Sequence, residues 1–169
     1  MRLHLTLFAL ASCLIATPVW SGEAAQPEIK LTTFRIGKLH IGMPASEVVG
    51  LPGCVFTKGK LVTSEADGGW HQTWRAPRCG LTLGFSAEDK KSPLKLFDMK
   101  VEAPSTLKTE KGIGIGSTDA QVRSQYLREI NTEESISQQN LVLGSVYGGV
   151  IFELDKGRGN SIFVGAAAE

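Results

Sequence analysis

The sequence is poor in the residues that hold metal ions. Its 169 residues include only three histidines and three cysteines, and after residue 25 only His40, His71, Cys54 and Cys79 remain. A structural metal site usually draws four such ligands together, and a redox pair is normally as close as Cys-X-X-Cys. These four residues show neither spacing. We therefore predict no metal site and no cofactor.

An excess of charge of one sign is also absent. Lys and Arg total 18 against 17 Asp and Glu, a net charge of +1. Nucleic acids and anionic membrane surfaces attract proteins that concentrate positive charge, so neither is an expected partner. Beyond the N-terminal segment no apolar stretch is long enough to cross a bilayer. We therefore predict no membrane span once that segment is removed.

Motifs for nucleotide binding and for hydrolysis are incomplete. The glycine-rich run at residues 112–118 leads into Asp119 without completing Gly-X-Gly-X-X-Gly, and no Gly-Lys-Ser/Thr is present. Nucleophilic hydrolysis needs a serine or cysteine with a base in reach, and no spacing ties His40 or His71 to a serine. We therefore predict no catalytic residue. The alternative is a small envelope hydrolase that uses His71 with an acid or serine brought near by folding.

Residues 1–25 have the pattern of a secretory signal peptide. A basic second residue precedes a short apolar run, and small residues then offer cleavage after Ser21, Ala24 or Ala25. Two alternatives stay open: the residues around Cys13 also resemble a bacterial lipoprotein box, and the segment would otherwise remain as an anchor. The predicted localisation is periplasmic or secreted.

Two cysteines in the exported part of such a chain most simply pair with each other. A bond between Cys54 and Cys79 would close a loop of about 25 residues and stabilise the fold by roughly 3–4 kcal/mol in the chain-entropy treatment. We therefore predict a structural disulfide between Cys54 and Cys79.

One octapeptide pattern occurs twice. Residues 41–48 (IGMPASEV) are echoed by residues 115–122 (IGSTDAQV), a separation that indicates one duplicated unit rather than a solenoid. Each copy precedes a predicted helix start. Pro44 suits a first helical turn because it has no N–H to leave unpaired, while Thr118 and Gln121 match a capping box.

Each predicted helix start is followed by stretches with the alternation of strands. After the second start, Val122, Tyr126 and Ile130 recur every four residues and predict an inward helical stripe, and the polar residues that follow are not predicted as a strand. We predict an α+β fold with two tandem units, each a short helix packed on antiparallel β-strands. The single secreted domain spans residues 26–169, with unit one at about 37–103 and unit two at about 112–165.

Four short stretches of the sequence form a further pattern: residues 41–48, Gly53-Cys54, Cys79-Gly80 and Leu83-Gly84-Phe85. With them the chain resembles a known family of secreted tandem-repeat proteins, the β-lactamase inhibitory proteins, and the related envelope lipoproteins of the BamE/OmlA type. The resemblance covers residues 41–86 and, with fewer matches, residues 115–164. It implies short helices packed on strands and a disulfide within a repeat, although the second unit here has no cysteine pair. It does not imply a shared target.

The strand predicted from Trp70 to Arg75 is the main candidate for binding. Alternation places Trp70 and Trp74 on one face, with His71 and Arg75 on the other. Inward tryptophans would fill the core, whereas outward tryptophans beside an arginine would form a binding hot spot. Tyr147, beside two glycines, is a second exposed-aromatic candidate. We predict an exported, non-catalytic module that binds a periplasmic or extracellular protein, as an enzyme inhibitor or an envelope assembly factor.

Overall fold

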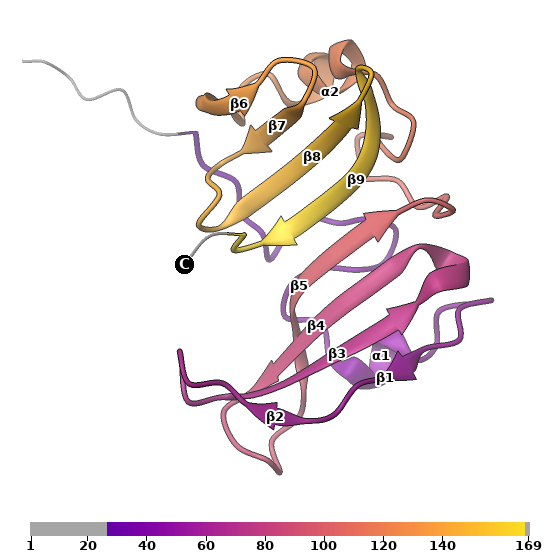
Figure 1. The fold of residues 1–169 in the computed structure, drawn as a ribbon, viewed down its shortest axis with the longest axis vertical. Helices are drawn as coiled ribbons and strands as arrows, with labels where there is room; N and C mark the ends of the chain where they lie inside the picture. The colour runs from indigo at the N-terminus through magenta and orange to yellow at the C-terminus, as the bar shows by residue number, and fades with distance from the viewer. Residues whose placement is uncertain (1–26, 168–169) are drawn as a thin grey trace, which may run out of the picture.

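The computed structural model describes residues 27–167, and within them the strands form one antiparallel sheet (Figure 1). Its nine strands follow the order β1-β3-β4-β5-β9-β8-β7-β6, and β2 also pairs with β3. Their bounds are β1 Thr57–Lys58, β2 Val62–Thr63, β3 Trp70–Ala76, β4 Leu81–Ala87, β5 Lys95–Glu102, β6 Ile130–Ile136, β7 Asn140–Leu143, β8 Gly149–Asp155 and β9 Arg158–Gly165. A single turn of 3-10 helix, Pro77–Cys79, links β3 to β4.

The sheet consists of two meanders joined edge to edge. Strands β3, β4 and β5 pair consecutively, and so do β6, β7, β8 and β9. The two sets meet where β5 pairs with β9, from Met99 opposite Val164 to Glu102 opposite Ser161. Figure 1 shows β5 and β9 side by side between the two halves. Main-chain hydrogen bonds therefore run continuously across the molecule.

One face of this sheet carries the core from end to end. Leu83, Met99, Val164, Val150 and Leu143 are successive cross-strand partners from β4 to β7, and each is fully buried. Directly paired residues point to the same face, so this row is one continuous apolar stripe. The opposite face is mostly polar or half-buried, but it also buries Val142, Asn131 and Ser161.

Two short helices contribute to the cover of the apolar face. Helix α1 (Ala45–Val48) lies behind β3 in Figure 1 and buries Val48. Helix α2 (Asp119–Tyr126) buries Val122 and Tyr126, whose ring lies 5.9 Å from that of Phe152. Loop segments with turns and isolated bridges supply the rest of the cover through buried apolar side chains: Phe34, Ile36, Leu39, Met43 and Ile113.

The two helix starts are held by the same backbone contacts. In each, the N–H of a glycine with positive φ donates to the carbonyl of a residue near the start of a central strand. The N–H of that strand residue donates to the carbonyl of the residue after the glycine. The N–H of the first helical residue donates to the carbonyl that lies two positions before the strand residue. The first set is Gly42 N to Leu96 O (2.7 Å), Leu96 N to Met43 O (2.9 Å) and Ala45 N to Leu94 O (2.9 Å). The second set is Gly116 N to Gly159 O (2.7 Å), Gly159 N to Ser117 O (2.8 Å) and Asp119 N to Gly157 O (3.0 Å).

The predicted α+β fold class is wrong, because the described chain is β-rich. Helix α1 is one turn of four residues, and its N-cap, Pro44, makes no side-chain hydrogen bond. Helix α2 has the capping box expected from Thr118 and Gln121, yet it spans only eight residues. Ile130 starts β6 instead of extending the helical stripe, and the polar segment after it pairs with β7. Helices this short cannot form a layer of their own.

Cys54 and Cys79 form the predicted disulfide, with Sγ atoms 2.01 Å and Cα atoms 5.7 Å apart. The bond fastens the segment after α1 to the turn after β3, and it is compatible with a secreted or periplasmic protein. No helix among residues 27–167 has the length and apolar character needed to cross a membrane. The predicted signal peptide, residues 1–25, and the alternative at Cys13 lie outside the described residues.

Candidate functional site

Strand β3 presents its two tryptophans on the helix-covered side of the sheet. Trp74 is 3% exposed and belongs to the core. Its ring lies 4.5 Å from Phe85 and 6.0 Å from Phe56, between centroids. Its indole N–H donates to Gln72 Oε1 at 2.8 Å, and Gln72 Nε2 donates to a backbone carbonyl of the edge segment. Of the two orientations left open by the sequence, Trp74 therefore has the inward one.

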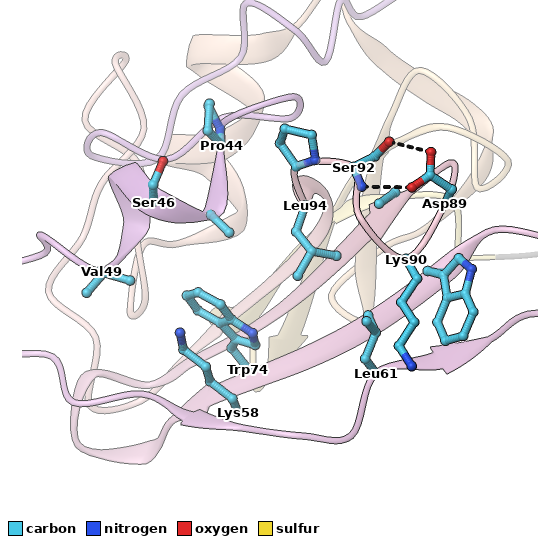
Figure 2. A pocket seen from close by; sticks show the side chains of 14 residues that line it. Pro44, Ser46, Val49, Lys58, Leu61, Trp74, Asp89, Lys90, Ser92 and Leu94 are labelled. Atoms are coloured by element: carbon cyan, nitrogen blue, oxygen red, sulfur yellow. Dashed lines mark hydrogen bonds between the residues drawn. The ribbon is translucent and has the colours of Figure 1, made fainter.

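Trp70 is only half-buried and lies at the open end of the same face. Together with the edge of Trp74 it lines a cavity of about 360 Å³, which we call the β3 groove. The other walls come from α1 and its flanks, from β1 and the connection to β2, and from the β4–β5 loop. Figure 2 labels ten of the lining residues: Pro44, Ser46, Val49, Lys58, Leu61, Trp74, Asp89, Lys90, Ser92 and Leu94. Most of these walls are apolar, and Val49 is 57% exposed.

Two lysines bring positive charge to this apolar groove. Lys58 Nζ lies 4.1 Å from the ring centroid of Trp74, and Lys90 Nζ lies 5.4 Å from that of Trp70. These are cation–π distances. Neither ammonium group forms an ion pair with a carboxylate of residues 27–167. The groove therefore combines indole rings with two cations that have no anionic partner in the described chain.

The one carboxylate in the lining, Asp89, is occupied by its own loop. Its oxygens accept hydrogen bonds from the Lys91 amide (2.7 Å), the Ser92 amide (2.9 Å) and Ser92 Oγ (2.8 Å); Figure 2 draws the two bonds from Ser92. These bonds, that of the Ser92 hydroxyl first, hold the pKa of Asp89 below its usual value. Asp89 thus remains ionised and shapes the loop that carries Lys90.

The opposite face of β3 carries His71 and Arg75. His71 Nε2 lies 2.9 Å from Asp67 Oδ2, and its ring meets Phe97 edge-on at 4.9 Å between centroids. Asp67 also accepts a hydrogen bond from the Gly69 amide, and this bond together with His71 lowers the pKa of Asp67. Asp67 therefore orders the Asp67-Gly68-Gly69 turn and orients His71 at the same time.

The alternative role of His71 in hydrolysis gains no hydroxyl partner from this arrangement. Ser86 is its cross-strand neighbour, but no hydroxyl in residues 27–167 forms a hydrogen bond with the ring. Asp98, on the same face, lies against Gly84, and burial raises the pKa of its carboxyl. This cluster therefore shows an ordered turn and a desolvated acid, without a nucleophile–base pair.

The structure separates the predicted binding residues into three places. Trp70 and Trp74 face the groove, while His71 and the exposed Arg75 lie on the opposite side of the sheet. Tyr147 is 67% exposed beside β8, and strands β4, β5 and β9 separate it from β3. These five residues therefore do not form one surface.

Reasoning from the sequence missed the groove's cations, Lys58 and Lys90, and the apolar side chains that close it, Val49 and Leu61. Val49 and Lys90 lie in turns, and Lys58 and Leu61 flank the short connection between β1 and β2, so no motif marks them. Among the described residues no cluster of three or more His, Cys, Asp or Glu side chains is placed to hold a metal ion. No protein-family model, curated protein or solved structure matches this chain.

Proposed function

We propose that this protein is an exported, non-catalytic protein-binding module, acting in the periplasm or outside the cell as an enzyme inhibitor or an envelope assembly factor. Its partner is a periplasmic or extracellular protein, and the partner docks at the β3 groove. The observation that carries the proposal is an open, mostly apolar hollow rimmed by Trp70 and the exposed Val49. Aromatic side chains at the centre of a dry pocket are the usual anchors of protein interfaces.

The proposal also treats the chain as two related units. The paired contacts at Gly42 and Gly116 support this part, because the same three backbone bonds recur at two helix starts that lie 74 residues apart in sequence. The resemblance of residues 41–86 and 115–164 to the β-lactamase inhibitory proteins points the same way. In that arrangement the groove belongs to the first unit, beside the disulfide-bonded segment.

Site-specific photocrosslinking in the cells that make the protein tests where the partner docks. A benzophenone amino acid replaces Val49 in the groove or, as the matched control, Leu127. Both are exposed apolar residues, 57% and 75% exposed, and both are the C-cap of a helix. We expect a discrete adduct from position 49, absent from position 127 and weakened by Trp70→Ala. Equal adducts from both positions, or an adduct from position 127 alone, would refute docking at the groove.

A further inference from the structure

We propose that the β3 groove recognises an acidic segment of its partner, in which one bulky apolar side chain enters the cavity and two flanking carboxylates bind Lys58 and Lys90. This inference rests on the proposed function, since it names the chemistry of the partner at the same site.

The lining of the groove carries more positive than negative charge. Lys58 and Lys90 have no ion-pair partner among residues 27–167, and Asp89 is held by three hydrogen bonds within its loop. An incoming carboxylate would therefore meet a lining with two ammonium groups and a single carboxylate, that of Asp89, whose oxygens are turned to their own loop. Each ammonium already lies over an indole ring, which restricts its position and presents it at the mouth of an apolar surface.

The size of the groove favours a single anchor side chain. Its volume of about 360 Å³ lies near the lower end of the range of small-ligand cavities, roughly 300–1,000 Å³. An aromatic or branched side chain fills such a space and buries a large apolar area with few rotatable bonds. Contact with Trp70, Leu61 and Leu94 would exclude water around it, as in the centre of a protein interface.

The spacing of the cations favours an extended peptide over an amphiphile with one anionic head. Lys58 lies over Trp74 and Lys90 over Trp70, and these two tryptophans are four residues apart on one strand, a backbone span of about 13 Å at 3.3 Å per residue. In Figure 2, Leu61 lies between the labelled Lys58 and Lys90 side chains. An extended segment places residues i, i+2 and i+4 on one side over the same span. The arrangement therefore fits acid, anchor and acid at alternate positions.

Three blocked pentapeptides test this chemistry by calorimetry and by NMR shift mapping on the purified protein. They are acetyl-Glu-Ser-Phe-Ser-Glu-amide, the same peptide with Gln for both Glu, and the same peptide with Ala for Phe. We expect the first to bind at the groove, and the other two to bind at least tenfold more weakly. Binding of the first should also weaken as salt rises from 20 to 300 mM, because exposed charges are screened.

The protein variants carry matched changes of charge. The double variant Lys58→Gln/Lys90→Gln should lose at least tenfold in affinity for the acidic Phe peptide. Lys38→Gln/Lys156→Gln, which removes two exposed lysines outside the groove, should bind within twofold of the parent. Circular dichroism and the thermal midpoint of each variant establish that both remain folded, so that a loss of affinity reports on the groove.

Three results would overturn the inference. Equal binding of the Gln peptide would show that charge does not select the partner. Failure of all three peptides at millimolar concentration, with the crosslink from position 49 intact, would refute the acidic segment while leaving the proposed docking site in place. Tighter binding of decanoate than of the acidic Phe peptide, lost in the Lys58→Gln/Lys90→Gln variant, would identify the ligand as a fatty anion instead.

Discussion

Replacing Trp74 with alanine should lower the free energy of unfolding far more than replacing Trp70 with alanine, although both residues lie on the same face of β3. Trp74 is 3% exposed and packs between Phe85, Phe56 and the Lys58 side chain. Substitution of a buried tryptophan by alanine costs about 3–5 kcal/mol through lost contacts and the cavity left behind. The variant also removes the donor to Gln72, so the loss should lie in the upper part of that range.

Urea denaturation and thermal melting followed by circular dichroism would measure this difference. For a domain of this size each kcal/mol lowers the melting temperature by about 2–4 °C, so a loss of about 4.5 kcal/mol corresponds to about 9–18 °C. Trp70→Ala, at a half-buried rim position, should lower stability by only about 1 kcal/mol. A Trp74→Ala loss below 1 kcal/mol, or a larger loss from Trp70→Ala, would refute the assignment of Trp74 to the core.

Three further predictions concern the elements that frame the groove and the sheet. Changing both Cys54 and Cys79 to alanine should lower the free energy of unfolding in urea by about 3.5 kcal/mol for their separation of 25 residues; a loss below 1 kcal/mol would contradict the structural role. Burial raises the pKa of Asp98. Ionisation of this carboxyl therefore destabilises the folded state once the pH exceeds the pKa that Asp98 has in the unfolded chain. Asp98→Asn should therefore be more stable than the parent at pH 7, and denaturation at stepwise lower pH should show this advantage shrinking towards about pH 4; a pH-independent difference would exclude the mechanism. Thr118→Ala removes the N-cap acceptor of α2 and should cost about 1 kcal/mol, whereas an unchanged urea midpoint would show that tertiary contacts alone hold the helix.

The strands were the most predictable part of the fold. Clean alternation marks β4 and β8, and the structure buries their apolar residues on one side. Strand β6 was missed because its sequence, INTEESI, has no alternating apolar pattern. An edge strand needs only one neighbour, and β6 is held by β7 together with side-chain bonds such as Asn131 Nδ2 to Gly144 O (2.9 Å). A strand that depends on such distant partners leaves little signal in its own residues.

The helices were overpredicted because their local sequence signals are clear but do not set their length. Local start signals exist at Pro44 and Thr118, but a start signal does not determine how far a helix continues. At α1 the proline N-cap accepts no helical N–H with its side chain, and the helix ends after one turn at Val49 and Gly50. The cover of the sheet is completed instead by the loop segments that carry Phe34 and Ile113. Whether a helix or a loop covers a given part of the sheet therefore depends on tertiary packing and not on the local sequence alone.

In the candidate site too, some features follow from the local sequence and others depend on residues far away in the chain. Alternation placed Trp70 and Trp74 on one face, but it does not specify which face meets the core, and β4 decides this by setting Trp74 directly opposite Leu83. Lys58 and Lys90 lie 32 positions apart in the sequence, and each becomes part of the groove only because its own segment packs beside β3. Lys58 is brought there by pairing with Trp74, and Lys90 by a loop that Asp89 closes through Ser92. A candidate site assembled from one strand pair and one loop therefore has no contiguous motif, and its charge pattern arises only when the sheet has formed.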